Sequence, residues 1–498
     1  MTQSTRRPAP RSVERRTLLK TTAGAAAAGG PFAGLLARQA AGAHEPPNAA
    51  ALVPVPDQRD GAVRLHLPQG FHYRSFHDTE QPVVLTDGTA LPGRHDGMGA
   101  FDGPRGSYVL VRNHEVNNPG TAFGPSTPYD PMARGGTTTV QVTPDGQVIR
   151  SFTSLNGTMM NCSGGQMPWG SWVTCEETVN GPDVGPDFTG TSNVPLTKPH
   201  GYVFEVPASH HPGQGQSSRR PITQAGRFAH EAVSFDPDGG RLYLTEDNFG
   251  FPSGFYRYRP PRSAMKAGRL LDGGTLQMLK VKGVDNAQLA AEQVTGATYD
   301  VQWVDIPEPD VQYDHTPGET APTPNDTALV HVASQGWAQG AAFFSRLEGQ
   351  VYRRGVVYFT STQGGGAPEA SAPAADGYGN GSGQVWAYDI RRRTLTCVFQ
   401  SPGPLVLDLP DNITTSKHGT LVVCEDSSGD NFIRGLTRRG RLFDIALNRL
   451  RSGSGADRSG DEFAGTTFSP DGRTLFVNIQ ASAGMSFAIW GPWRRIGV

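Results

Sequence analysis

Short runs of β-branched and aromatic residues, each closed by a turn signal, recur along most of this chain. Glycine and proline together make up about a fifth of the 498 residues, which favours many turns over long helices. The sequence therefore predicts an all-β protein, with helices expected only at 286–294 and 435–442. The clearest predicted strands lie in SYVLVRN (107–113), TTTVQVTPDGQVIRSF (137–152), HGYVFEV (200–206), RLYLTED (241–247), GVVYFTST (355–362), QVWAYDI (384–390), TLVVCED (420–426) and TLFVNIQ (474–480).

The tripeptide Pro-Asp-Gly recurs at 144–146, 237–239 and 470–472. The offsets are close to two and five units of about 46 residues, which is the period of a four-stranded propeller blade. A closed propeller also protects the edges that so many short strands would otherwise expose. We predict a single β-propeller over residues 44–498, with six blades and decorated loops. Two β-sandwiches are the alternative, but no linker or change of composition supports them.

The first 43 residues are typical of an export signal. Arg15 and Arg16 precede a weakly apolar run rich in alanine and glycine, and Ala41-Gly42-Ala43 resembles a cleavage site. This order indicates a twin-arginine signal peptide. We expect the twin-arginine translocase as a partner during export, and a periplasmic or secreted location. The apolar run is a poor membrane span, so no stable membrane anchor is expected.

Removal of this leader changes the charge balance. It leaves 37 of the 44 basic and 45 of the 46 acidic residues, a net charge of −8. Such a surface does not favour nucleic-acid binding. We expect a monomer that acts on small molecules.

Four cysteines remain, and Cys162 differs from the others. None of them has the spacing of a C-x-x-C motif or a zinc finger. An exported protein can form disulfides, and the pairing among Cys175, Cys397 and Cys424 stays open. Cys162 instead opens the polar, glycine-rich stretch NCSGGQMPWGSWVTCEE (161–177).

Carboxylates next to small or polar residues gather where predicted strands end. Singly, such residues are usually solvated. Gathered at one end of a propeller channel, they would repel one another unless cations neutralised them. Carboxylate oxygens suit hard cations such as calcium, and a thiolate favours a softer metal such as iron or zinc. The sequence thus predicts a mixed metal site. Its candidate segments are NHE (113–115), NCSGG…CEE (161–177), GRFAHEA (226–232), TEDN (245–248), SRLE (345–348), CED (424–426) and DEFAG (461–465).

Taken in this order, these segments resemble the PhoX-type alkaline phosphatases. PWGSW…CEE, GRFAHE and FSPDGRTLFVNIQ are the most specific parts, and the resemblance covers about residues 60 to 490. The chain is similar to the shorter branch of that family. The resemblance implies a six-bladed propeller that hydrolyses small phosphate monoesters. It also implies two Fe³⁺ and three Ca²⁺ ions around a bridging oxide.

The resemblance further implies roles for single residues. Arg346 is similar to the phosphate-binding arginine, and Asn113 to a second phosphate contact. The choice of Glu177 over Glu176 as a ligand depends on spacing alone. Cys162 is implied as the thiolate ligand of iron, and Glu231 as a carboxylate bound to the iron–calcium cluster. The remaining carboxylate ligands, mostly of calcium, are Glu177, Glu348, Asp426 and Glu462.

Two other functions stay open at this point. One is a calcium-dependent propeller lactonase or phosphotriesterase, which would contain calcium but no iron. The other is a non-catalytic binding propeller whose site has decayed.

Overall fold

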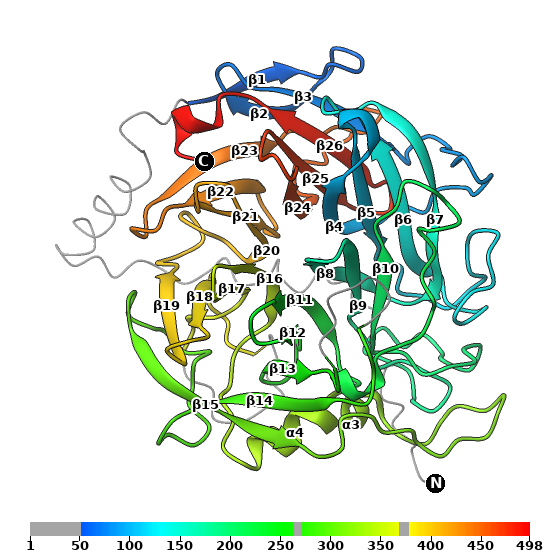
Figure 1. Cartoon of the computed structure of the whole chain (residues 1–498), viewed down its shortest axis with the longest axis vertical. Coiled ribbons are helices and arrows are strands. Elements are labelled where there is room, and N and C mark those ends of the chain that lie inside the picture. Colours follow the sequence, from blue (N-terminus) through cyan, green and yellow to red (C-terminus); the bar gives the residue numbers. More distant parts are fainter. Residues whose placement is uncertain (1–50, 263–269, 368–377) are drawn as a thin grey trace, which may run out of the picture.

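The described part of the chain forms a closed ring of antiparallel sheets. A computed structural model describes residues 51–262, 270–367 and 378–498, so the predicted leader lies outside the described residues. Each innermost strand contacts the next one, and the last contacts the first (Figure 1). The predicted all-β propeller is confirmed. The inner strands are β4 (His95–Asp102), β8 (Asn161–Met167), β11 (His230–Asp236), β16 (Leu347–Arg353), β20 (Pro410–Thr415) and β24 (Glu462–Phe468).

Each inner strand and the strands that extend outward from it are described here as one sheet, although the outermost strands of the sheets that begin at β11 and β16 pair and join these two into one nine-stranded sheet. β4 is followed by β5 (Tyr108–His114), β6 (Gly135–Val142) and β7 (Val148–Thr158), and β8 by β9 (Ser171–Glu176) and β10 (Val203–Pro207). β11 is followed by β12 (Arg241–Glu246), β13 (Phe255–Arg259), β14 (Thr275–Val281) and β15 (Thr298–Ile306). β16 is followed by β17 (Val356–Ser361), β18 (Gln384–Asp389) and β19 (Thr394–Gln400). β20 is followed by β21 (Leu421–Glu425), β22 (Phe432–Leu436) and β23 (Leu442–Asn448). β24 is followed by β25 (Thr474–Gln480) and β26 (Met485–Trp490).

The N-terminal strands close the ring. β3 (His72–Phe76) pairs antiparallel with β26 and is the outermost strand of the last sheet. β1 (Leu52–Pro56) and β2 (Val63–Pro68) extend the preceding sheet through β23. Because the two ends of the described chain share sheets, the ring closes through backbone hydrogen bonds. This closure protects strand edges that would otherwise be exposed.

All eight runs predicted as strands contain strands, but both predicted helices are wrong. In 286–294 the backbone amides of Asn286 and Ala290 donate to the carbonyls of Gly340 and Phe343, so the segment pairs with a neighbouring loop. Segment 435–442 contains the turn between β22 and β23. The described α-helices are α3 (Asn325–Leu329) and α4 (His331–Trp337), which lie between β15 and β16.

The Pro-Asp-Gly turns are not spaced by whole blades, so the repeat interpretation is wrong in detail. The turn at 237–239 joins β11 to β12, and that at 470–472 joins β24 to β25. These two turns are equivalent but lie three sheets apart, whereas the turn at 144–146 joins β6 to β7. Long loops lengthen the stretch of sequence that forms each sheet, so equivalent turns are not separated by a fixed number of residues.

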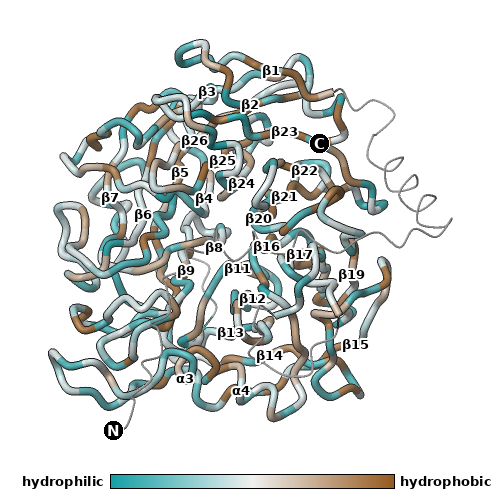
Figure 2. Tube along the Cα trace, turned by 180° about the vertical axis from the view of Figure 1, so that it is seen from behind, coloured by the Kyte–Doolittle hydropathy of each residue, from teal (hydrophilic) through white to brown (hydrophobic). Residues whose placement is uncertain are grey.

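Hydrophobic side chains pack between neighbouring sheets. Phe255 of β13 stacks on Phe359 of β17 with ring centroids 4.4 Å apart. Figure 2 shows the ring from behind, with hydrophobic stretches along the strands and hydrophilic stretches in many outer loops. None of the helices in the described ranges has the length and apolar character that a bilayer crossing requires.

Candidate metal centre

Three of the six predicted ligands occupy a repeated position at the start of the inner strands. Cys162, Glu231 and Glu348 are each the second residue of their strand, β8, β11 and β16. Asp411 has the same place in β20. In each case the pairing register shifts across this residue, as in a β-bulge. Bulges redirect side chains, often next to active sites. The repeated bulge therefore brings these side chains to one end of the central channel.

Three overlapping groups of ligand atoms form one continuous cluster. Within each group, one atom of every residue lies within 4.8 Å of the others. Glu231 belongs to the first two groups and Asp411 to the last two, so these residues join the groups. The groups are Cys162–Glu177–Glu231, Glu231–Glu348–Asp411 and Asp411–Asp426–Glu462. The structure thus brings together all six metal ligands that the sequence predicted.

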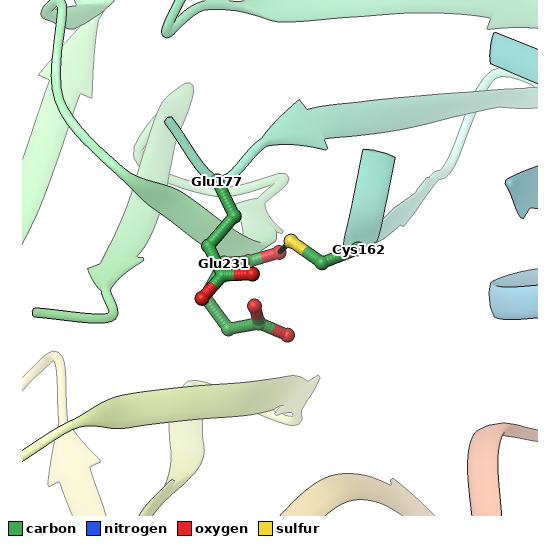
Figure 3. A group of neighbouring side chains, drawn as sticks. All are labelled: Cys162, Glu177 and Glu231. Atoms are coloured by element: carbon green, nitrogen blue, oxygen red, sulfur yellow. Dashed lines mark hydrogen bonds between the residues drawn. The ribbon is translucent and has the colours of Figure 1, made fainter. Parts of the chain in front are cut away.

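The Cys162 thiol lies at one end of the cluster. Figure 3 shows the thiol and the carboxylates of Glu177 and Glu231 converging. Burial raises the pKa of Cys162 well above its usual value, and the neighbouring Glu231 and Glu177 raise it further. A thiolate at this position therefore requires a cation, which a coordinating metal supplies. All four cysteines are free and buried, so no disulfide links Cys175, Cys397 and Cys424 in this structure.

The carboxylates also need cations. Burial raises the pKa of Glu231, and Glu348 and Glu177 raise it further. Burial and the charge of Asp426 raise the pKa of Asp411 to about 7, and the same two causes raise that of Glu462. Like charges this close cannot all ionise without compensation. An oxygen-rich donor set with one sulfur fits hard cations together with one softer metal.

Glu177 lies in the cluster, and Glu176 does not. Glu176 is fully buried and accepts hydrogen bonds from His200 Nδ1 at 2.6 Å and from the backbone amides of Met159, Gly201 and Tyr202. Its two oxygens are thus engaged in the protein interior. Successive strand side chains point to opposite faces, so the two glutamates separate at the end of β9.

Arg346 lies beside the cluster. Its Nη2 contacts Glu348 Oε1 at 2.8 Å. Its Nε and Nη2 also donate to Asp247 Oδ1 and Oδ2, at 3.0 and 2.7 Å. The guanidinium is therefore held by an acidic neighbour on each side and is mostly buried. The ion pair with Glu348 places the guanidinium next to the group Glu231–Glu348–Asp411.

The side chain of Asn113, the second predicted phosphate contact, is hydrogen-bonded to protein groups in this structure. Its Nδ2 donates to the carbonyls of Cys162 and Ser163, at 2.9 and 2.7 Å. Its Oδ1 accepts from Trp172 Nε1 at 3.0 Å. Both amide hydrogens are thus engaged with backbone carbonyls. Asn113 supports the bulged backbone that presents Cys162.

Sequence reasoning missed Asp411 and Asp96. Asp411 lies within LPDNITT, which was not among the predicted strands, so its position at a strand start was not evident. Asp96 is the second residue of β4 and lies in the register shift of that strand. Burial raises the pKa of Asp96, and Glu115 and Asp411 raise it further. The repeated position at the start of each inner strand is the signal that identifies both residues.

A ring of sheets whose inner strands gather carboxylates and one thiol defines a metal-dependent β-propeller enzyme. Comparison with known families agrees with this class. A family model described as alkaline phosphatase PhoX matches residues 50–483. The chain therefore belongs to the alkaline phosphatase PhoX family, and it is a metal-dependent phosphomonoesterase.

The solved structure of a phosphatase shows the same fold. PhoX of Pseudomonas fluorescens, solved in complex with vanadate, a transition-state analogue, is 18% identical with a TM-score of 0.61. The match covers 89% of this chain and 98% of that chain. Virginiamycin B lyase from Staphylococcus aureus (11% identity, TM-score 0.37) covers 84% of this chain and 99% of its own. A gluconolactonase from Xanthomonas campestris (12%, 0.37) covers 88% and 98%. The last two likenesses are too weak to support any conclusion about the fold or the function of this chain. No curated protein sequence matches the chain.

Proposed function

We propose that the chain hydrolyses small phosphate monoesters at the cluster that joins Cys162 to Glu462, with iron and calcium as cofactors. The observation that supports this proposal is the continuity of the three ligand groups. They share Glu231 and Asp411, and only the first group contains sulfur. One end of the site thus offers a sulfur ligand for a softer metal, and the other end offers oxygen ligands for hard cations.

Two Fe³⁺ and three Ca²⁺ ions are the proposed complement, by resemblance to the family. Cys162, Glu177 and Glu231 would hold iron. The carboxylate groups around Glu348, Asp411, Asp426 and Glu462 would hold calcium. When bound, these ions would neutralise the carboxylates and supply a nucleophilic oxygen at ordinary pH.

Arg346 is the proposed phosphate-binding residue. A guanidinium is always charged and is weakly hydrated, so it suits the recognition of a phosphate oxygen. Asp247 and Glu348 hold this guanidinium beside the cluster. Little rotamer freedom is therefore left to lose when a substrate binds.

His230 is a proposed structural support for Glu231. Burial lowers the pKa of His230 to about 3, so the ring is neutral. Its Nε2–H donates to the carbonyl of Gly226 at 2.9 Å, and the ring lies over Phe228 with centroids 3.6 Å apart. The start of β11 is thereby held in place, and with it the shared ligand Glu231.

The site of action is proposed to lie outside the cytoplasm, in the periplasm or beyond. The twin-arginine pattern of residues 1–43 supports this location. Export by that route would let metals be inserted before the folded protein crosses the membrane.

Elemental analysis combined with a phosphatase assay tests the proposal. We expect both iron and calcium in protein purified from a host with twin-arginine export. We also expect release of phosphate from p-nitrophenyl phosphate that a chelator abolishes. Calcium without iron, together with lactone or phosphotriester hydrolysis, would favour the lactonase or phosphotriesterase alternative. A full set of metals without any hydrolysis would favour a binding propeller.

A further inference from the structure

An exposed aromatic side chain lies beside the proposed phosphate-binding arginine. Phe249 is the third residue after β12, in the connection between β12 and β13. The Cζ atom of Arg346 lies over its ring, 5.9 Å from the ring centroid. This separation is within the range of a cation–π contact. Phe249 is nevertheless 39% exposed, so protein atoms cover only part of this residue.

Phe249 lies at the same end of the ring as the ligand cluster. β11 and β12 are antiparallel, and His230 at the start of β11 pairs with Glu246 at the end of β12. The connection that follows Glu246 therefore begins at the end of the channel where Glu231 enters the cluster. Topology and the contact with Arg346 thus place Phe249 at the edge of the proposed site.

Backbone hydrogen bonds hold this connection against the segment that carries Arg346. The amide of Ser253 donates to the carbonyl of Phe344 at 2.9 Å, and the amide of Phe344 donates to the carbonyl of Ser253 at 3.1 Å. The carbonyl of Phe249 itself accepts from the amide of Tyr378 at 2.8 Å. The position of the Phe249 ring next to the guanidinium therefore depends on several backbone contacts and not on the cation–π contact alone.

The position of Phe249 distinguishes it from other exposed apolar residues. Single exposed apolar side chains are common on protein surfaces and need no function. The Phe249 ring, however, contacts the guanidinium of Arg346. A phosphate monoester held by this guanidinium carries its ester group one bond from the phosphorus atom. The ester group is therefore within reach of the ring, and contact between them would remove apolar surface from water.

We propose that Phe249 contacts the ester group of the substrate and favours phosphate monoesters of aromatic alcohols. This inference rests on the proposed function, in which Arg346 binds the phosphate. Two aromatic rings attract each other in offset or edge-on arrangements, beyond the effect of the area that they bury. A polar aliphatic group such as glycerol gains no such contact. Phe249 is thus a specificity-determining residue and is not required for the hydrolysis of the phosphate ester.

Binding of two phosphonates to the metal-loaded full chain tests this contact without requiring hydrolysis. Benzylphosphonate and ethylphosphonate both replace the ester oxygen by a CH₂ group, and only the first carries an aromatic ring. In calorimetric titrations, Phe249→Ala should weaken the binding of benzylphosphonate by about 2- to 10-fold, which is the range that an aromatic contact supplies. The binding of ethylphosphonate should not change, and Phe249→Trp should retain the preference for benzylphosphonate.

Leu271→Ala is the matched control. Leu271 is also 39% exposed. It lies just before β14, whose first residue Thr275 pairs with Arg259 at the end of β13, on the side of the ring opposite to the cluster. Both phosphonates should therefore bind this variant as they bind the wild type.

Steady-state kinetics provide the second measurement. Phe249→Ala should lower kcat/KM for phenyl phosphate by about 2- to 10-fold and leave kcat/KM for glycerol 2-phosphate unchanged. An equal loss for both phosphonates would overturn the proposal, because Phe249 would then act only by supporting Arg346. Unchanged binding of both would also overturn it. Hydrolysis of neither ester, together with a preference for benzylphosphonate that Phe249→Ala removes, would support this contact and contradict the proposed function.

Discussion

Arg346 and Asp247 form a two-point ion pair, with Nε–Oδ1 and Nη2–Oδ2 distances of 3.0 and 2.7 Å. Arg346 also has a φ of 42°, which is uncommon for a residue other than glycine. This backbone conformation directs the side chain toward Asp247 and Glu348, and the ion pairs hold it there. The geometry of the proposed phosphate-binding residue thus depends on an acidic residue 99 positions earlier in the chain.

Replacement of Asp247 should impair catalysis through Arg346. In Asp247→Asn, one charged partner is lost and the guanidinium is less well oriented. We expect kcat/KM for p-nitrophenyl phosphate to fall by about 10- to 100-fold, mostly through a higher KM. The control is Asp389→Asn, whose partner Arg392 is 78% exposed and which should have wild-type kinetics. Unchanged kinetics in Asp247→Asn would contradict the positioning role.

The two adjacent glutamates should behave differently. Glu177→Gln removes a cluster carboxylate and should reduce the metal content measured by elemental analysis. Glu176→Gln should retain the metals but lower the free energy of unfolding by about 1–3 kcal/mol. The reason is that four buried donors lose a charged acceptor. If Glu176→Gln lost metal and Glu177→Gln did not, the assignment of the ligand would be reversed.

Cys162→Ala should lose iron and activity together. The thiol is the one sulfur in the ligand groups of the described residues, so its removal leaves an all-oxygen site that binds iron less well. Iron content and phosphatase activity are measured on the same preparation. Cys175→Ala, at a buried thiol outside the cluster, is the matched control and should retain both. A fully active Cys162→Ala protein without iron would rule out the thiolate assignment.

His200 should make stability depend on alkaline pH. Burial alone would lower the pKa of His200, but Glu176 and Asp130 outweigh burial and raise it to about 9. The stabilisation is therefore fully present below pH 6.5 and is lost as pH rises through about 9. It amounts to about 3 kcal/mol.

Chemical denaturation at pH 6, 8 and 10 checks this prediction. The difference in free energy of unfolding between wild type and His200→Gln should be largest at pH 6 and small at pH 10. His211→Gln, at an exposed position, should show no such trend. A difference that stays constant with pH would exclude a charged His200.

The site was predictable from the sequence only in part. Cys162, Glu231 and Glu348 could be predicted because they lie in segments that have turn or strand signals. The same segments carry the family resemblance. Asp411 has no such segment around it, and its role emerged only when β20 took its place beside β16 and β24. A motif near a site does not reveal which way a side chain points, and only the structure showed that the Asn113 amide faces the backbone of Cys162 and Ser163.

The sequence by itself determined the strands and the chemical character of the site. Alternating β-branched residues and turn signals are local, so they specified the strands of the ring without any tertiary contact. The tertiary structure decided which carboxylates meet. That outcome depends on bulges at the start of the inner strands and on closure of the ring by β3, both of which need partners far away in the chain. For the same reason only the tertiary structure separated Glu177 from Glu176 and placed Phe249 beside Arg346.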